Sequence, residues 1–528
     1  MNKKHVLFSY SVPLILGLST TLMNAAKVYA KTLSSETTSA SIHKNQAMTE
    51  HYYNYLISDQ SSTLPALILL MNRIPKGADL HHHYSGALYA ETYLKWVGEK
   101  QYCIYKDYLP SLKIEKYTVE KQAFDTLSEA SKNICLKADM IYRNTDFYRE
   151  LLSQWSDSNY DSAYASKTPP DQHFFDTFKY FNDISELNYS AGLEELKTRA
   201  KNENVQYLET MLKSAPSFTP AEFENKINAL NAESSEDEIN ELLEKFSAFL
   251  NTNTEFKSKI SAYISMLEQA SRDIDDEEFT LRFQSYASRN NPPIKVFSSL
   301  YGAFLAAQST PKIVGINLVG PENGYVAMRD YSLHMKMFQF LKKRFPHTPL
   351  ALHAGELSLG MVPPEGLTHH INEAVHIASA NRIGHGVDIV HETNAYSLLK
   401  TMKEKNVVVE INLSSNAFIL GIQKETHPIT LYQNYNIPIV ISSDDAGISR
   451  NNLSQEYFLF TSRYKPSYQT LKKVIYNSIH YSFLSPSNKT RELKKLDKNF
   501  QVFEAIIAEN IKNTTLYPMS KMKPSTNY

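Results

Sequence analysis

Ile439-Val440-Ile441-Ser442-Ser443-Asp444-Asp445 is a short apolar run that ends in two hydroxyl side chains and two carboxylates. So short a run of β-branched residues predicts a strand that is buried on both faces, as in a parallel sheet covered by helices. Enzymes built on parallel barrels place their catalytic groups at the carboxyl ends of such strands. The stretch therefore predicts a barrel strand that ends at a functional site.

Six other short apolar runs resemble this one and are separated from one another by helical patterns. With it, the predicted strands are residues 78–83, 205–209, 313–319, 349–353, 381–385, 407–413 and 437–443. Strands that alternate with helices indicate a parallel sheet, and a barrel of this kind needs about 250 residues. We therefore predict an α/β fold, a (β/α)8 TIM barrel, whose eighth strand lies near residues 294–298.

The chain has 528 residues, more than one such barrel needs, and the remaining segments differ in composition. Residues 31–47 are rich in Ser, Thr and Lys and predict no fixed structure, whereas 48–72 have the apolar spacing of helices. The predicted organisation is a signal peptide at 1–30, a partly helical N-terminal extension at 31–73, a barrel domain at 74–515 and a C-terminal tail at 516–528. Within the barrel domain we predict a cysteine-bearing insertion at 99–165 and a helical insertion at 217–290.

The N-terminus has the pattern of a secretory signal, with a basic head, a mostly apolar run and small residues around Ala30. We therefore expect an exported protein, secreted or periplasmic, with an uncleaved membrane anchor as the alternative. No later apolar run approaches the roughly 20 residues of a membrane span, so we expect no stable membrane anchor.

Charge and cysteine content exclude some partners and sites. Lys and Arg total 55 against 56 Asp and Glu, a formal net charge of −1. A nucleic-acid-binding protein normally carries a basic excess, so we expect no nucleic-acid partner. Cys103 and Cys135 are the sequence's only cysteines. In an oxidising compartment they can form a disulfide, and otherwise they are two free thiols. Two cysteines are too few for a thiolate-rich zinc site.

Several of the predicted strands end in side chains suited to a metal site. His81 and His83 are two residues apart on one strand, so their side chains face the same way and can ligate one ion. His353, at a later strand end, can be a third imidazole ligand, and Asp444 can complete the set through oxygen. Three histidines and one aspartate predict a mononuclear zinc site with an open position for water.

Three further side chains are predicted to act on a substrate. Glu356 follows His353 closely and can take and return protons beside an activated water. His385 lies between two glycines and can hold the attacking water or stabilise an oxyanion. Asp445 diverges from Asp444 and can face the substrate. The alternatives are a chance histidine-rich loop, solvated loop side chains and, for the acidic pair, a helix N-cap.

These motifs resemble those of the adenosine deaminase family. The resemblance is carried by PKGADLHHH at 75–83, HAGE at 353–356, RIGHG at 382–386 and SSDD at 442–445, and it extends from about residue 73 to 460. The chain most resembles the extracellular, growth-factor-related branch, which is similarly exported and has N-terminal helices and a cysteine-bearing insertion.

The resemblance implies one zinc ion and hydrolytic deamination of adenosine, and of deoxyadenosine, to inosine and ammonia. Zinc-bound hydroxide would attack C6 of the purine. Glu356 would protonate the neighbouring ring nitrogen, and His385 would orient the hydroxide. Asp445 would contact N7, and the backbone N–H of Gly320 would lie near N3. The zinc ligands would be His81, His83, His353 and Asp444. A homodimer through the N-terminal helices is a further expectation from the family.

The sequence departs from the family pattern near the second histidine. Ser85 stands where many members have an aspartate that touches the ribose, so sugar recognition is left open. Tyr84 replaces a more usual aliphatic residue and is expected to shape the pocket mouth. Residues 173–176, with the sequence His-Phe-Phe-Asp, resemble a family segment near the substrate.

Two other functions are compatible with this pattern. One is a sister amidohydrolase that deaminates adenine, a modified adenosine or an adenine nucleotide. The other is a non-catalytic secreted binding protein on the same scaffold.

Overall fold

The computed structural model describes residues 39–58, 63–109, 114–158, 160 and 168–513. The predicted signal peptide and C-terminal tail lie outside the described residues. Among the described helices, none combines the length and the hydropathy that crossing a bilayer requires. The chain divides into two compact units, one of Leu56–Leu496 and one of Met1–Tyr55 with Asp497–Tyr528.

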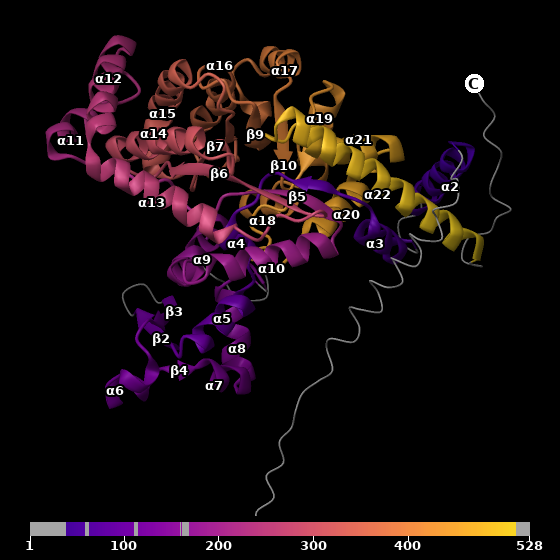
Figure 1. Cartoon of the computed structure of the whole chain (residues 1–528), viewed down its shortest axis with the longest axis horizontal. Coiled ribbons are helices and arrows are strands. Elements are labelled where there is room, and N and C mark those ends of the chain that lie inside the picture. Colours follow the sequence, from indigo (N-terminus) through magenta and orange to yellow (C-terminus); the bar gives the residue numbers. More distant parts are fainter. Residues whose placement is uncertain (1–38, 59–62, 110–113, 159, 161–167, 514–528) are drawn as a thin grey trace, which may run out of the picture. The chain divides into compact units, whose positions relative to one another are not determined.

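The larger unit is built on eight parallel strands, which confirms the predicted α/β barrel (Figure 1). β1, β5, β6 and β7 pair in that order, and β8, β9, β10 and β11 pair as a second set. The bounds are β1 (Gly77–Asp79), β5 (Val205–Thr210), β6 (Thr280–Ser288), β7 (Ile313–Val319), β8 (Ala351–Ala354), β9 (Arg382–His385), β10 (Val408–Ile411) and β11 (Ile439–Ile441).

Two further pairings join these sets into a ring. Ile316 of β7 pairs with Leu350, next to β8, and its backbone N–H donates to Pro349 O at 3.1 Å. His82, just after β1, pairs with Asp444, just after β11. The second pairing lies at the carboxyl ends of both strands, so closure of the barrel brings the first and last predicted motifs together.

Helices follow the strands, and most of them cover the outside of the ring, whereas α5 packs against α9 (Figure 1). They are α4 (Tyr84–Ala87), α5 (Ala90–Glu99), α9 (Pro170–Ser185), α10 (Tyr189–Asn202), α11 (Ala221–Asn228), α12 (Glu236–Thr252), α13 (Thr254–Ala270), α14 (Pro293–Ser309), α15 (Tyr325–Arg344), α16 (His370–His376), α17 (Ala395–Glu404), α18 (Leu413–Leu420), α19 (Ile429–Asn434), α20 (Leu453–Tyr464) and α21 (Tyr468–His480). Before β1 lies α3 (Leu64–Arg73).

The position predicted for the eighth strand is wrong. Residues 294–298 belong to α14, where Pro293 occupies the first turn, a position that suits proline because its missing N–H has no helical partner there. The eighth strand is β6, inside the range predicted as a helical insertion. The range 217–290 therefore consists of α11, α12 and α13 followed by a barrel strand. Polar side chains interrupt the apolar pattern of β6: Gln284 faces the barrel interior, where it bonds Glu209 and Asn317, and Ser285 faces Tyr263 of α13.

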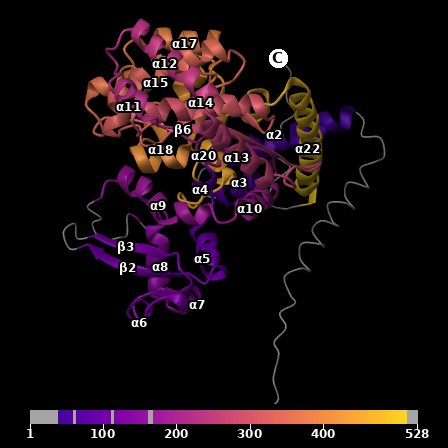
Figure 2. The ribbon, with the colours of Figure 1, turned by 60° about the vertical axis from the view of Figure 1, so that its left-hand side comes forward.

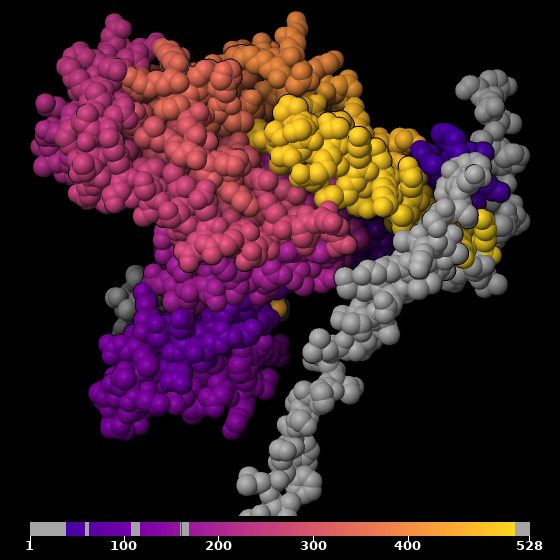
Figure 3. All heavy atoms as spheres, in the orientation of Figure 1, coloured from indigo at the N-terminus to yellow at the C-terminus, as the bar shows by residue number. Residues whose placement is uncertain are grey.

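The cysteine-bearing segment forms a small lobe beside α5 and α9 (Figures 1 and 2), which projects from the barrel in the space-filling view (Figure 3). Its three strands pair antiparallel in the order β3-β2-β4. Cys103 and Cys135 are joined by a disulfide across 32 positions of sequence. The elements are β2 (Cys103–Leu109), β3 (Ile114–Glu120), α6 (Glu129–Lys132), β4 (Leu136–Lys137), α7 (Ala138–Arg143) and α8 (Thr145–Gln154).

The N-terminal extension is helical further upstream than predicted. α2 spans Ser39–Ser58, so part of the segment 31–47 forms a helix despite its polar composition. In the smaller unit, Thr49 Oγ1 of α2 donates to the carbonyl of Glu504, which lies on α22 (Pro486–Asn513). Packing against α22 therefore accounts for a helix that the sequence pattern of the segment alone does not predict.

Candidate metal and active site

The four predicted metal ligands meet at the carboxyl ends of the barrel strands. Among the described residues there are three groups whose possible ligand atoms all lie within 4.8 Å of one another. They are His81 with His83 and His353, His81 with His385 and Asp444, and His83 with Asp444 and Asp445. The backbone pairing of residues 81–83 with Asp444 fixes two of the contributing segments side by side, since Asp444 N–H donates to His81 O at 2.9 Å. The predicted ligand set is thus assembled from three separate parts of the chain.

Buried partners on the far side of two histidines orient their rings. His81 Nδ1 lies 2.7 Å from Glu410 Oε2, so it donates there and a neutral ring presents a lone pair at Nε2. His353 Nδ1 lies 2.8 Å from Asn317 Oδ1. That oxygen also accepts the backbone N–H of Leu318, so it is an acceptor, and His353 likewise presents a lone pair at Nε2.

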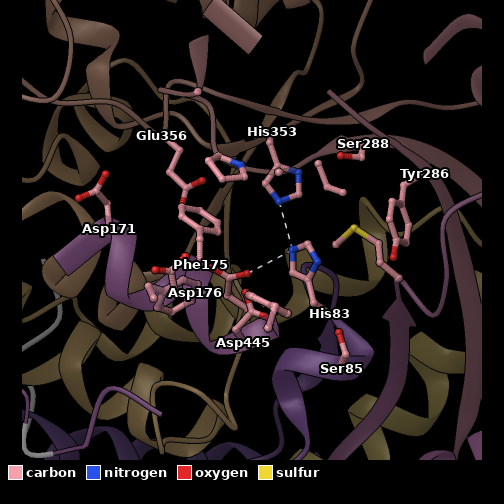
Figure 4. A pocket seen from close by; sticks show the side chains of 18 of the residues that line it. His83, Ser85, Asp171, Phe175, Asp176, Tyr286, Ser288, His353, Glu356 and Asp445 are labelled. Carbon is pink, nitrogen blue, oxygen red and sulfur yellow. Dashed lines mark hydrogen bonds and ion pairs between the residues drawn. The ribbon is translucent and has the colours of Figure 1, made fainter. Parts of the chain in front are cut away.

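These lone pairs face one another and a carboxylate at close range. The Nε2 atoms of His83 and His353 are 3.2 Å apart, as the dashed line in Figure 4 marks. Asp444 Oδ1 lies 3.3 Å from His81 Nε2 and 3.4 Å from His83 Nε2. Nε2 of His81 is buried without a hydrogen-bond partner. The lone pairs of neutral His81 and His353 therefore point to a carboxylate and a third imidazole, and a cation between these groups would bind all of them, so three imidazoles and one carboxylate fit a zinc-like ion.

The electrostatics of the ligand cluster also favour a cation. Burial lowers the pKa of His81, but the carboxylates of Asp444 and Glu410 outweigh burial and raise that pKa to about 10. Burial raises the pKa of Asp444, yet the neighbouring His81 outweighs it and holds the pKa well below its usual range. The site therefore stabilises positive charge at the point where the ligand atoms meet.

Glu356 lies near the ligand cluster, and hydrogen bonds to its backbone fix its position. Its pKa is raised well above the usual range by burial and by the negative charges of Asp444 and Glu322, so the site favours the protonated carboxyl group. Glu322 accepts the backbone N–H groups of Gly355 at 3.1 Å and Glu356 at 2.8 Å. Gly355 has a φ of +77°, and a Cβ there would lie 2.4 Å from Asp388 Oδ1, so this turn requires glycine.

Asp445 faces the cavity, in a direction different from that of its neighbour. Its Oδ1 atom is buried without a hydrogen-bond partner, and burial together with the charge of Asp444 raises its pKa well above the usual range. A Cβ at Gly86 would lie 1.5 Å from this oxygen. The position of Asp445 therefore depends on a glycine that the sequence motifs did not single out.

His385 completes the group around the ligand cluster. Its φ of +68° is a left-handed conformation that few side chains adopt, and such strain concentrates at functional sites. Its Nε2 atom lies 3.6 Å from Glu356 Oε1 and 3.9 Å from Asp444 Oδ2. Burial lowers its pKa to about 3, so the ring is neutral near pH 7.

One cavity of about 740 Å³ is large enough for a nucleoside-sized molecule. Of the residues described above, it is lined by His83, His353, His385, Glu356, Asp444 and Asp445. Ser85 and Gly320 also line it, at the places where the sequence predicts contacts with a sugar and a base. Gly320 has a φ of +106°, which suits glycine. Figure 4 shows side chains of α9, among them Phe175 and Asp176, around the same space as Glu356. The metal-binding and substrate-binding roles of these residues stay predictions.

Two expectations near the cavity need adjustment. Tyr84 does not line the cavity: it is fully buried, its hydroxyl donates to Ser185 O at 3.3 Å, and its ring packs on Tyr189. Of residues 173–176, Phe174, Phe175 and Asp176 line the cavity. His173 does not, because its Nε2 lies 3.0 Å from the carbonyl of Ser156. The aromatic and acidic lining of the cavity from α9 extends beyond this motif.

A buried polar network beneath the ligand cluster was not predicted. Glu410, the partner of His81, accepts from Arg382 Nε at 2.5 Å, and Arg382 Nη2 donates to Glu209 at 2.6 Å. Gln284 connects Glu209 to Asn317, the partner of His353. A charged or amide side chain inside an apolar strand is the signal that could have identified these residues, because a buried polar group requires a partner.

Part of the chain is similar in sequence to known proteins. Residues 259–499 match the family model described as adenosine deaminase. The adenosine deaminase of Clostridium perfringens strain SM101 is 32% identical over 181 residues, which cover 34% of this chain and 49% of that protein. The adenosine deaminase of Clostridium kluyveri is 28% identical over 177 residues, 33% of this chain and 45% of that protein. The chain therefore spans about half the length of the curated relatives it matches.

Structural comparison extends over more of the chain. The apo structure of the N6-methyl-AMP deaminase from Arabidopsis thaliana superposes with a TM-score of 0.50 at 16% identity, over 82% of this chain and 98% of that one. The arabidopsis ADAL structure complexed with GMP gives a TM-score of 0.51 at 16% identity, over 81% and 98%. At such identities the likeness shows a shared fold.

Proposed function

We propose that the chain is an adenosine deaminase, since its residues 259–499 match that family's model, and that it hydrolyses adenosine and deoxyadenosine to the corresponding inosines and ammonia. One observation carries the proposal: ligand atoms of His81, His83, His353 and Asp444 lie close together, and the last three of these residues line the cavity that also holds Glu356. That arrangement supplies an ion site and a proton donor side by side, which hydrolytic deamination of a purine needs.

His81, His83, His353 and Asp444 would hold a zinc ion. Bound there, zinc supplies a Lewis acid that activates water at neutral pH. Glu356 starts in its protonated form and gives its proton to the ring nitrogen next to C6, which makes C6 electrophilic. Water adds at C6, and the C6–N bond to the amino group then breaks. The two hydrogens of the consumed water end on ammonia and on the ring nitrogen, so Glu356 finishes as it began.

The remaining cavity residues orient the substrate. Asp445, whose pKa is raised by burial, shares a hydrogen bond with N7 of the base. The backbone N–H of Gly320 lies near N3, and the Ser85 hydroxyl contacts the sugar. Neutral His385 presents a ring nitrogen to the point where water adds. None of these contacts requires the 2′-hydroxyl, the one group by which the two nucleosides differ, so deoxyadenosine and adenosine both fit the proposal.

A substrate panel tests the proposal. The purified chain, loaded with one equivalent of zinc, is given adenosine, deoxyadenosine, adenine and an N6-modified adenosine, and released ammonia is measured. We expect turnover of the two nucleosides. Turnover of adenine or the modified nucleoside alone would favour the sister amidohydrolase. Absence of both zinc binding and ammonia release would favour a binding protein.

We expect nucleosides to be preferred over nucleotides because the cavity is acidic. Asp171 and Asp176 line it, and Lys179 is the single lysine or arginine among the described lining residues. Lys179 Nζ is already paired with Asp176 Oδ1 at 2.5 Å. Bringing a phosphate against carboxylates costs several kcal/mol, so kcat/KM for AMP should be about 100-fold below that for adenosine. Asp176→Asn, which frees Lys179, should narrow this ratio, and an equal rate for AMP in the unmodified enzyme would contradict the expectation.

Glu410 should set the affinity for zinc through His81. Removing a partner that orients a metal-bound histidine typically costs 10- to 100-fold in affinity. Glu410→Gln should therefore raise the zinc Kd by about 10- to 100-fold in competition with a chromophoric chelator. Glu404→Gln, at an exposed position of α17, is the matched control and should leave the Kd unchanged. Equal Kd values for both variants would refute a role for Glu410.

We further propose that the enzyme is exported and acts outside the cytoplasm. The pattern of residues 1–30 supports this, and so does the Cys103–Cys135 disulfide, because such bonds persist in oxidising compartments. Cell fractionation with N-terminal sequencing of the product tests it. Recovery of the full-length chain in the cytosol would contradict it.

A further inference from the structure

The ring of His385 has a second set of contacts on the side away from the cavity. Its Nδ1 atom lies 2.9 Å from Asn416 Nδ2 and 3.4 Å from Asn412 Nδ2. On the far side of Asn416, His427 Nε2 lies 3.0 Å from Asn416 Oδ1. All four side chains are buried, with at most 1% of each exposed. The contacts form an unbroken line from His427 through Asn416 to His385.

A backbone group fixes the direction of hydrogen bonding along this line. The N–H of Ile429 donates to His427 Nδ1 at 3.2 Å, so this nitrogen is an acceptor. A neutral imidazole has one N–H, which must then be at Nε2 of His427 and must donate to Asn416 Oδ1. The amide nitrogen of Asn416 consequently points to His385 and donates to its Nδ1.

The opposite orientation of the Asn416 amide is excluded by the same backbone group. It would present an N–H to His427 Nε2, and both ring nitrogens of His427 would then have to accept, which no neutral imidazole can do. A charged His427 would instead place an N–H against the N–H of Ile429. Burial, followed by the charge of Arg463, lowers the pKa of His427 to about 3, so the ring is neutral near pH 7.

We propose that Asn416 and His427 are positioning residues that hold His385 in the tautomer with its proton on Nε2, the nitrogen that faces Glu356 and the ligand cluster. The inference rests on the proposed function, because it assigns how His385 takes part in that reaction. With Nδ1 occupied as an acceptor, neutral His385 enters the reaction as a hydrogen-bond donor at Nε2. It therefore orients the attacking oxygen by donation and stabilises charge that develops there.

Nuclear magnetic resonance of the zinc-loaded protein tests the tautomer directly. With ¹⁵N-labelled histidine, ring nitrogens that carry a proton are distinguished from those that do not, and His385→Asn and His427→Gln assign the two rings. The unmodified protein should show both rings protonated at Nε2 and unprotonated at Nδ1. A proton on Nδ1 of either ring would overturn the proposal, and this readout needs no turnover.

Asn416→Asp provides the matched functional test. The substitution keeps size and shape but replaces the donor by a carboxylate, which accepts a proton from Nδ1 and so reverses the tautomer of His385. Since a wrong tautomer removes the donor from the site, kcat should fall by at least about 100-fold with little change in KM. Asn434→Asp, exposed at the end of α19, should change neither the tautomer nor kcat.

The outcomes separate the two proposals. A variant Asn416→Asp that is folded, has an unchanged His385 spectrum and turns over at the wild-type rate would overturn the positioning role while the deaminase proposal stands. An unmodified protein with the expected tautomers but no ammonia release from any purine would overturn the proposed function instead. If Asn416→Asp does not fold, the spectrum of the unmodified protein decides.

Discussion

Glu356→Gln should abolish nearly all deamination while leaving the metal and nucleoside sites intact. The amide has the shape of the carboxyl group but holds no proton of suitable acidity to give to the ring nitrogen. Proton transfer by a positioned side chain contributes about 10²- to 10⁴-fold, so kcat for ammonia release should fall by that factor. Zinc content and inosine binding by calorimetry should stay near those of the unmodified enzyme.

We expect kcat to fall without loss of zinc or inosine binding because the backbone at residue 356 is held by another side chain. Glu322 accepts the backbone N–H groups of residues 355 and 356, so the loop is fixed independently of the side chain that is changed. Glu365→Gln, on an exposed part of the same loop, is the matched control and should retain full activity. Activity of Glu356→Gln within about tenfold of the unmodified enzyme, with zinc retained, would refute the assigned role.

Arg382→Met should cost about 3–5 kcal/mol of the free energy of unfolding. The guanidinium is 1% exposed, pairs with Glu209 and Glu410, and lies 3.8 Å above the ring of Phe483. Methionine fills part of the volume but leaves two buried carboxylates without their cation. Breaking a buried ion pair by removing one partner is far more costly than removing a surface pair.

Urea unfolding at saturating zinc measures this loss. The control is Arg344→Met, whose arginine is 28% exposed and pairs with Glu244, which is 62% exposed. That pair should contribute at most about 1 kcal/mol because water screens it. If the two variants lose the same small amount, the network beneath the ligand cluster is not a major source of stability.

The sequence allowed the barrel and the ligand cluster to be predicted because both depend on local patterns. A short β-branched run such as Ile439–Ile441 is buried on both faces, and parallel strands end on one side of the barrel. His81, His353 and Asp444 could therefore be placed together from their positions at strand ends alone. The convergence of their side chains in the structure agrees with that reasoning.

What could not be predicted depends on contacts between distant segments. β6 was missed because Gln284 points a polar side chain into the barrel, where it bonds Glu209 and Asn317. The roles of Glu410 and Asn416 depend on which histidine nitrogen each reaches across the fold, and spacing along the chain carries no such information. Likewise, the requirement for glycine at position 86 becomes apparent only from its contact with Asp445 in the folded chain.

Ammonia release from adenosine by chelator-treated protein, measured as zinc is added back, tests the central claim most directly. The account predicts no activity before zinc is added, and activity that rises in proportion to zinc up to one ion per chain. Inosine and ammonia should form in equal amounts. Stoichiometric zinc binding with no ammonia from adenosine or deoxyadenosine would contradict the account, and so would full activity of the metal-free chain.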